Sequence, residues 1–195
     1  GNGMKIIIVG PGAMGCLFAA FLTKSKEDVW LLDKNKENAC KLNESGISLE
    51  GVSGSWQTKI KATASIADIG KADLILICVK SFNTKLAIEQ IKPLLLEDTK
   101  ILTLQNGMGN IEIISEIAGI ERVIGGVTNE GATLIDLGKI RHAGRGETVI
   151  GTISGKTPVE IRAIREVFNK AGFETKMTRD IKSLIWSKLI INVGI

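Results

Sequence analysis

The segment MKIIIVGPGAMGCLFAAFLTKS, residues Met4–Ser25, decides the fold of this chain of 195 residues. It begins with the apolar run Ile6–Val9, which has the length and composition of a buried strand. Three glycines follow, Gly10, Gly12 and Gly15, and the residues after them have the apolar spacing of a helix. A strand that enters a helix through G-x-G-x-x-G is typical of a dinucleotide-binding unit.

Each glycine has a physical task in such a unit. Gly10 permits the tight turn, Gly12 lets a pyrophosphate approach the backbone, and Gly15 lets the helix pack close to the strand. The free N–H groups at the N-terminus of the helix would bind the phosphates. A tight turn without a ligand is the alternative. The spacing favours a cofactor-binding loop made of these residues: Gly10, Pro11, Gly12, Ala13, Met14 and Gly15.

The end of the second expected strand, DVWLL, bears on which dinucleotide binds. Asp33 follows this strand, about where the residue that meets the adenosine ribose is expected. Its carboxylate would accept a hydrogen bond from a 2′-hydroxyl and would repel a 2′-phosphate. Lys34 and Lys36 come next, and either ammonium could neutralise a phosphate. The residues alone leave NAD(H), NADP(H) and a solvated strand end without a cofactor role all open.

Strands and helices alternate through the first two thirds of the chain. Apolar, strand-sized runs such as Leu74–Val79 are separated by helical stretches, which predicts a parallel sheet covered on both faces. Residues 47–62 are expected to form a hairpin with Gly51 and Gly54 near its turn. Residues 132–153 contain several short strand-like pieces separated by glycines, and we expect them to extend the sheet in antiparallel fashion.

The last part of the chain is expected to begin a new unit. Pro158 is suited to the first turn of a helix that runs to about Ala171, and a short strand and a further helix from Asp180 follow. We predict an α/β, Rossmann-type, doubly wound and mainly parallel sheet over residues 4–178. Residues 179–195 would then be the first helix of a truncated helical domain.

Composition narrows the class of function. The formal net charge is +4 and the lysines are scattered, which argues against a nucleic-acid partner. The apolar runs are too short to span a membrane, and the N-terminus lacks the pattern of a signal peptide. Cys16, Cys40 and Cys78 show no C-x-x-C spacing, so we expect buried thiols in a reducing cytoplasm. His142 is the only histidine, which excludes a histidine-rich metal site and favours a structural or solvated role for that residue.

The closing stretch WSKLIINVGI places polar groups in an apolar helix. Lys188 and Asn192 are four residues apart and therefore share a helix face, which also carries Ile185 and Leu189. A lysine on a helix usually extends its ammonium to solvent. Here apolar residues lie nearly all round it, which favours a buried ammonium. Trp186 is expected to be a core residue.

Three further stretches give the chain a resemblance. CVKSFNT (Cys78–Thr84) follows the third strand, QNGMGN (Gln105–Asn110) follows the next, and W-S-K-L-x-x-N (Trp186–Asn192) lies near the end. Together with the glycine loop, this ordered set resembles the ketopantoate reductase (2-dehydropantoate 2-reductase) family from Met4 onward.

The resemblance implies NADPH-dependent reduction of 2-dehydropantoate to pantoate, in pantothenate and coenzyme A biosynthesis, at a site between two domains. Carried over, the catalytic lysine is Lys188, and Asn192 and Asn106 would bind substrate. Lys80 and Asn106 would lie beside the nicotinamide and ribose, and Lys34 would hold the 2′-phosphate. The resemblance thus implies NADP(H), with NAD(H) an alternative because of Asp33. A cytoplasmic enzyme without a metal and possibly a homo-oligomer is expected.

Elementary chemistry agrees with a lysine acid. Hydride addition to a keto group leaves charge on the oxygen, and a positioned cation stabilises that charge and can deliver a proton. Burial lowers the pKa of an ammonium, which helps it to donate near neutrality. Two other functions stay open: a different 2-keto or 3-hydroxy acid dehydrogenase on the same framework, and a non-catalytic dinucleotide-binding module. We expect the chain by itself to be inactive, because its second domain is incomplete.

Overall fold

The computed structural model describes residues 3–79, 83–104 and 108–192 of the chain. Its strands are β1 (Lys5–Val9), β2 (Asp28–Leu32), β3 (Ile47–Gly51), β4 (Trp56–Thr58), β5 (Lys61–Thr63), β6 (Ala72–Ile77), β7 (Leu95–Thr103), β8 (Val123–Thr128), β9 (Gly131–Asp136), β10 (Lys139–Gly144), β11 (Thr148–Thr152) and β12 (Thr175–Met177). Its α-helices are α1 (Ala13–Lys24), α2 (Lys36–Ser45), α3 (Thr84–Ile91), α4 (Gly109–Ala118), α5 (Val159–Ala171) and α6 (Ile181–Asn192).

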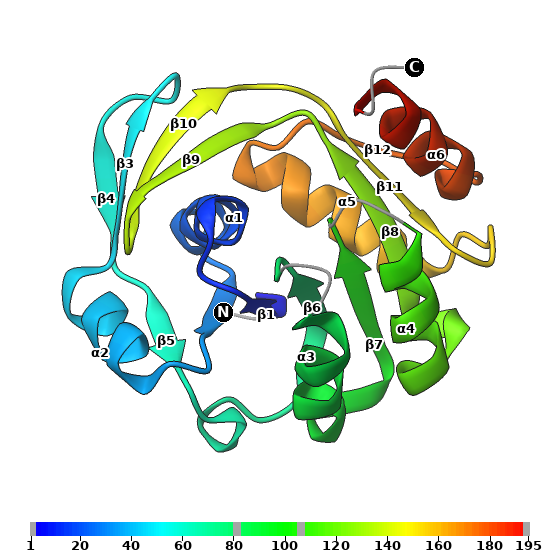
Figure 1. Ribbon diagram of the computed structural model, residues 1–195, viewed down its shortest axis with the longest axis horizontal. Helices are drawn as coiled ribbons and strands as arrows, with labels where there is room; N and C mark the ends of the chain where they lie inside the picture. Colours follow the sequence, from blue (N-terminus) through cyan, green and yellow to red (C-terminus); the bar gives the residue numbers. More distant parts are fainter. Residues whose placement is uncertain (1–2, 80–82, 105–107, 193–195) are drawn as a thin grey trace.

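The main sheet has eight strands in the order β12-β11-β8-β7-β6-β1-β2-β5 (Figure 1). Strands β5, β2, β1, β6, β7 and β8 are parallel, and their order in the sheet is that of a doubly wound dinucleotide-binding fold. Strand β11 runs antiparallel to β8, and β12 runs parallel to β11. The mainly parallel Rossmann-type sheet with an antiparallel extension is therefore confirmed.

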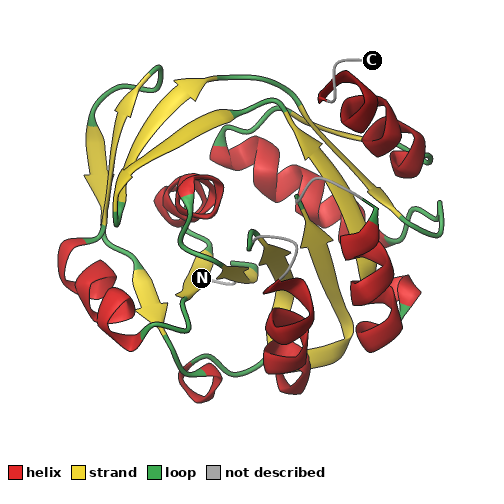
Figure 2. Ribbon diagram, in the orientation of Figure 1, coloured by secondary structure: helices red, strands yellow, loops and turns green. Residues whose placement is uncertain are grey.

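Alternate residues of β1 belong to different cores. Ile6 and Ile8 pack with α1 and α5 on one face of the sheet, whereas Ile7 and Val9 pack with α3 and α4 on the other. Helices cover both faces, as Figure 2 shows. Because both sides of each central strand are buried, these strands read as continuous apolar runs in the sequence.

Four strands form a second sheet, in the order β4-β3-β10-β9. The hairpin of β3 and β4 was expected, and its pairing of Ile47 with Thr58 confirms it. Strands β9 and β10 differ from expectation, because they leave the main sheet and join this hairpin, with β10 parallel to β3. The second sheet lies over α1 on the side away from the main sheet (Figure 1). Helix α1 is consequently enclosed, and eight of its residues are buried.

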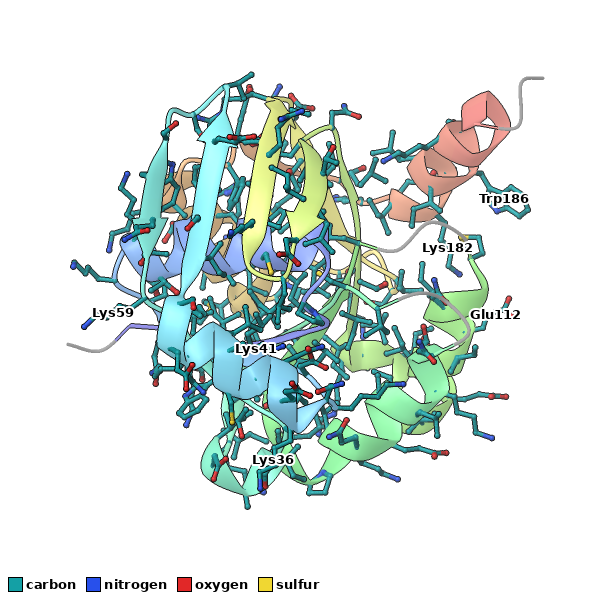
Figure 3. The ribbon with its side chains drawn as sticks, turned by 60° about the vertical axis from the view of Figure 1, so that its left-hand side comes forward. Lys36, Lys41, Lys59, Glu112, Lys182 and Trp186 are labelled. Carbon is teal, nitrogen blue, oxygen red and sulfur yellow. The ribbon has the colours of Figure 1, made fainter. Side chains whose placement is uncertain are left out.

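Two expectations about burial are wrong. Trp186 is 53% exposed and points away from the body of the molecule on α6 (Figure 3), so it is not a core residue of the part of the chain that the structure describes. Cys40 is exposed on α2, whereas Cys16 is buried and Cys78 is partly buried. Both errors have one cause. The sequence shows that a residue on a helix is apolar, but whether its side of the helix is buried depends on which element packs there. Within the described ranges, no helix is long and apolar enough to cross a membrane.

Candidate functional site

The glycine loop has the geometry that its spacing predicts. Gly10 has a φ of +109°, in the left-handed region that favours glycine. A Cβ on Gly15 would lie 2.1 Å from the carbonyl oxygen of Gly10, so only glycine lets the helix come this close. A Cβ on Gly12 would meet no atom within 4 Å. Gly10 and Gly15 are thus required by the fold, whereas Gly12 leaves open space where a ligand can approach the backbone.

Helix α1 begins directly after this loop. Gly12 is its N-cap residue and has no side chain with which to bind the first N–H groups of the helix. No acidic residue lies in the first turn, where Ala13 and Met14 are partly exposed, so the positive end of the helix dipole is not offset locally. The Sγ of Cys16 donates to the carbonyl oxygen of Pro11 at 3.3 Å. Burial raises the pKa of Cys16 to about 12, which keeps this donor protonated. These features suit an anion such as a pyrophosphate.

A cavity of about 420 Å³ opens in front of the loop. It lies at the carboxyl ends of β1, β2 and β6, where the chain order of the sheet reverses, and open α/β sheets bind ligands at such a point. Its apolar wall comes partly from Leu86 and Ala87 of α3. The lining residues include members of the loop and of the ends of β2 and β6: Gly10, Pro11, Gly12, Asp33, Lys34, Cys78 and Val79.

Asp33 presents a buried carboxylate to this cavity. Asp33 is only 6% exposed, and its Oδ1 accepts a hydrogen bond from the N–H of Asn35 at 2.9 Å. Oδ2 has no hydrogen-bond partner within the described parts of the chain. Buried oxygens of this kind are rare in folded proteins, so Oδ2 is available to accept a hydrogen bond from a ligand, for example from a ribose hydroxyl. The neighbouring Lys34 is exposed at the mouth of the cavity.

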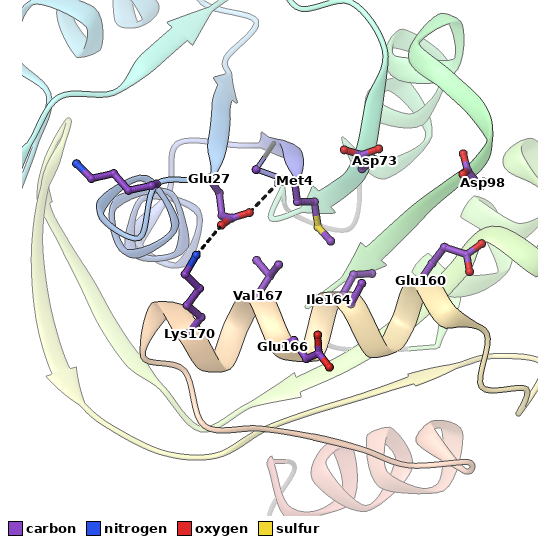
Figure 4. Close-up of a pocket in the computed structure, with 12 residues that line it drawn as sticks. Met4, Glu27, Asp73, Asp98, Glu160, Ile164, Glu166, Val167 and Lys170 are labelled. Atoms are coloured by element: carbon purple, nitrogen blue, oxygen red, sulfur yellow. Dashed lines mark hydrogen bonds and ion pairs between the residues drawn. The ribbon is translucent and has the colours of Figure 1, made fainter. Parts of the chain in front are cut away.

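A larger cavity, of about 720 Å³, lies at the opposite edge of the main sheet. Figure 4 shows it between α5 and the amino-terminal parts of the strands, with Glu27 bonded to the N–H of Met4 and facing Lys170. It has a rim of carboxylates that includes Asp73 and Asp98 and has no glycine loop. The edge of the sheet and the chemistry of the lining both favour the smaller cavity as the dinucleotide site.

Lys188 lies where α6 crosses the end of β8. Gly125 permits this packing, because even a Cβ there would already be 3.2 Å from Ile181 and Ile185. The partly buried Nζ of Lys188 donates to the carbonyl oxygen of Thr128 at 3.0 Å. Burial lowers the pKa of the Lys188 ammonium below its ordinary value. A partly buried lysine with a lowered pKa is better suited to donate a proton near neutral pH than a solvated surface lysine is.

The other predicted site residues can be placed only in part. Lys80 and Asn106 lie outside the described residues. Asn192 ends α6, and its side chain is also outside the described part. His142 is fully buried and bonded to Ser53, in agreement with a structural role. Among the described residues, no group of three His, Cys, Asp or Glu side chains could hold a metal ion.

Sequence reasoning missed two parts of the site. Thr128, whose carbonyl oxygen binds Lys188, ends a strand with no side-chain pattern that signals this contact. Asn83, Leu86 and Gln90 line the cavity from α3 and the residue before it, although Leu86 is 67% exposed. The sequence offers no signal for Leu86, because its exposure is known only from the structure.

Comparison with known proteins decides the family. Residues 6–155 match the family model described as "Ketopantoate reductase PanE/ApbA". The chain belongs to the ketopantoate reductase family. The 2-dehydropantoate 2-reductase of Pyrococcus horikoshii is 38% identical over 192 residues, which are 98% of this chain and 62% of that protein. The chain thus spans less than two thirds of the length of such relatives.

Solved structures of ketopantoate reductases have the same fold. The 2-dehydropantoate 2-reductase of Geobacter metallireducens superposes with a TM-score of 0.90 at 33% identity, covering 97% of this chain and 63% of that one. A D-mandelate dehydrogenase in a ternary structure with NADH and anilino(oxo)acetate has a TM-score of 0.89 at 25% identity, covering 97% and 61%. A similar fold is therefore also found in a D-mandelate dehydrogenase, in a structure that contains NADH.

Proposed function

We propose that this chain is the dinucleotide-binding part of an enzyme that reduces 2-dehydropantoate to pantoate, a step towards pantothenate and coenzyme A. One observation carries the proposal: the partly buried ammonium of Lys188 lies at the carboxyl edge of the sheet that also forms the dinucleotide cavity. A module that only binds a dinucleotide needs the glycine loop but has no use for this ammonium. The names of the relatives support the substrate.

The chemistry assigned to the chain's own residues is simple. The glycine loop and the start of α1 would hold the pyrophosphate, and Asp33 would orient a ribose. The dinucleotide, when bound, supplies the hydride that reduces the keto carbon. Lys188 would stabilise the negative charge that develops on the keto oxygen and deliver a proton to it. Lys80, Asn106 and Asn192 are proposed to complete the site, on the resemblance alone.

The domain division belongs to the same proposal. Residues 4–178 would form the dinucleotide-binding domain, and residues 179–195 would begin a helical second domain. The chain covers 62% of the Pyrococcus horikoshii relative, so that relative has room for a further domain. Lys188 would then lie on the first helix of the second domain, next to the dinucleotide-binding domain. A cytoplasmic location and a possible homo-oligomer remain predictions from the resemblance.

Substrate identity is tested with the longer enzyme that contains this chain. We expect a higher kcat/KM for 2-dehydropantoate than for aromatic 2-keto acids. We expect no useful turnover by residues 1–195 alone, because the cleft then has one wall. The D-mandelate dehydrogenase neighbour makes an aromatic 2-keto acid the second candidate. Steady-state assays of reduced dinucleotide consumption compare them. A preference for the aromatic substrate would replace 2-dehydropantoate in the proposal.

The cofactor depends on Asp33 and Lys34. The resemblance predicted NADP(H), with the exposed Lys34 beside the 2′-phosphate. The buried Asp33, with its unpaired Oδ2, supports NADH instead, because a second anion there would be repelled at low dielectric constant. We therefore propose NADH as the preferred cofactor of this chain, which departs from the expectation drawn from the resemblance.

Titration calorimetry of this chain with both cofactors tests the preference. We expect NADH to bind about tenfold more tightly than NADPH, which corresponds to ~1.4 kcal/mol. Asp33→Asn keeps the shape of the side chain but removes its charge, and should abolish most of this difference. Glu37→Gln, an exposed change on α2, is the matched control and should leave both affinities unaltered. Tighter binding of NADPH, lost in Lys34→Ala, would assign the choice to Lys34.

A further inference from the structure

The carbonyl group that binds Lys188 belongs to a peptide fixed at both ends. Thr128 accepts from Nζ of Lys188 at 3.0 Å, and the N–H of Asn129 in the same peptide donates to the carbonyl oxygen of Glu147 at 2.9 Å. A peptide is planar, so its C=O and N–H turn together. Any rotation of this group would break both bonds. The position of the 145–147 segment therefore sets the direction of the acceptor of Lys188.

Glu130 holds that segment in place. Its side chain is 1% exposed, and Oε2 accepts the N–H of Gly146 at 2.8 Å. The two segments touch so closely that a Cβ on Gly146 would lie 2.5 Å from the Cβ of Asn129. The carboxylate thus joins two pieces of backbone at a distance that only glycine allows. One of these pieces contains Glu147, which binds the peptide above.

Glu130 also acts on Thr128 directly. Its backbone N–H donates to Oγ1 of Thr128 at 3.1 Å, and the same hydroxyl pairs with Oγ1 of Thr148 at 2.9 Å. Both threonines are buried at the ends of neighbouring strands. Thr128 is consequently held through its side chain as well as through its peptide. The bond to its hydroxyl comes from the backbone of residue 130 and is kept in every Glu130 variant, so only the bond to Gly146 depends on the Glu130 side chain.

The remaining carboxylate oxygen faces two nitrogen groups. Oε1 is 3.5 Å from Nε2 of His142 and 3.8 Å from Nε of Arg145, both too long for a good hydrogen bond. Burial lowers the pKa of His142, and the nearby Glu130 opposes that shift without cancelling it. Burial thus disfavours a charged imidazole, and Arg145 places a guanidinium nitrogen 3.8 Å from Oε1. The bond to Gly146 is the specific contact of this carboxylate.

We propose that Glu130 is a positioning residue for Lys188, because it fixes the Thr128–Asn129 peptide whose carbonyl group holds the ammonium. The inference rests on the proposed function only where it concerns catalysis. The geometric part, that Glu130 orders the ammonium through this peptide, applies to the 195-residue chain by itself.

The geometric part is tested by ¹⁵N NMR of lysine side chains in this chain. A hydrogen-bonded, slowly exchanging ammonium signal assigned to Lys188 by its loss in Lys188→Arg should vanish in Glu130→Ala. Glu130→Gln should restore it, because an amide oxygen can still accept from Gly146. The control Ser53→Ala disturbs the same buried histidine from its other side and should leave the signal intact. Persistence in Glu130→Ala, or equal loss in Ser53→Ala, would overturn the proposal.

The catalytic part is tested in the longer enzyme. Glu130→Ala should lower kcat ~10–100-fold, as small misplacements of catalytic groups do, with the KM for dinucleotide unchanged within about twofold. In a Lys188→Ala background, Glu130→Ala should cause no further loss of kcat, because residues that act as a unit are not additive. An additional loss of full size would show that Glu130 acts independently of Lys188 and would refute positioning.

The two proposals fail in different ways. Normal kcat in Lys188→Ala would refute the role of Lys188 in the proposed function and, with it, the catalytic part of this inference. A large loss in Lys188→Ala with normal kcat in Glu130→Ala would refute positioning alone. If Glu130→Ala does not fold, Glu130→Asp replaces it: the shorter carboxylate keeps its charge but cannot reach Gly146, and the same losses are expected.

Discussion

Replacement of Lys188 by alanine in the longer enzyme is expected to lower kcat by roughly 10²–10⁴-fold. The ammonium is partly buried, its Nζ is held by Thr128, and it has no carboxylate partner in the described part of the chain. Its charge is thus available to a developing alkoxide. The affinity for the dinucleotide should change little, because the proposed contacts with it come from Asp33 and the glycine loop. Stopped-flow and steady-state kinetics measure both quantities.

The pH profile identifies the donor. An acid works only while protonated, so kcat should fall as pH rises through the pKa of Lys188, which burial places below its ordinary value of 10.5. This descending limb should disappear in Lys188→Ala. Asn192→Ala is the contrast: a neutral amide one helical turn away should chiefly raise the KM for the keto acid. If the kcat of Lys188→Ala were within about threefold of the parent, Lys188 would have no catalytic role and would be an ordinary surface lysine.

Gly12→Val is expected to abolish detectable binding of either dinucleotide to this chain, a loss of at least ~100-fold. The valine side chain would occupy the space that a pyrophosphate needs. The fold should tolerate it, because a Cβ meets no atom within 4 Å and φ is −71°. Calorimetry measures the affinity, and thermal unfolding without ligand checks that the variant is folded.

Two other glycines serve as controls for Gly12→Val. Gly144 also has open space around a Cβ but lies outside the loop, so Gly144→Val should bind normally. Gly15→Ala should instead lower the free energy of unfolding, since its Cβ would lie 2.1 Å from the oxygen of Gly10. Unchanged affinity of Gly12→Val for the dinucleotide would show that the glycine loop is not part of the binding site.

The sequence was informative wherever one element carries its own pattern. The run Ile6–Val9, the glycines after it and the helix Ala13–Lys24 each follow from local spacing, and the main sheet follows from repeating that unit. The pocket could be anticipated for the same reason, because it forms where strand ends of known order meet. Asp33 was located by its distance from the glycine loop.

Contacts between distant segments could not be anticipated. The pairing of β3 with β10 joins residues about ninety positions apart, and nothing in 132–153 distinguishes a strand of the main sheet from one of the second. The acceptor of Lys188 is a backbone carbonyl group at Thr128, which has no signature in residue type. Trp186 was misjudged because apolarity predicts burial only when a partner element is present.

The enclosure of α1 between two sheets has a consequence for biosynthesis. Helix α1, which follows the glycine loop, is synthesised before the strands β9 and β10 that cover its far side, and these come more than a hundred residues later in the chain. At ~5–20 residues per second, that delay is roughly five to twenty-five seconds. During this interval Phe21, whose ring finally rests against His142 of β10, lacks one of its neighbours. The apolar surface of α1 is therefore fully covered only after β9 and β10 have been synthesised.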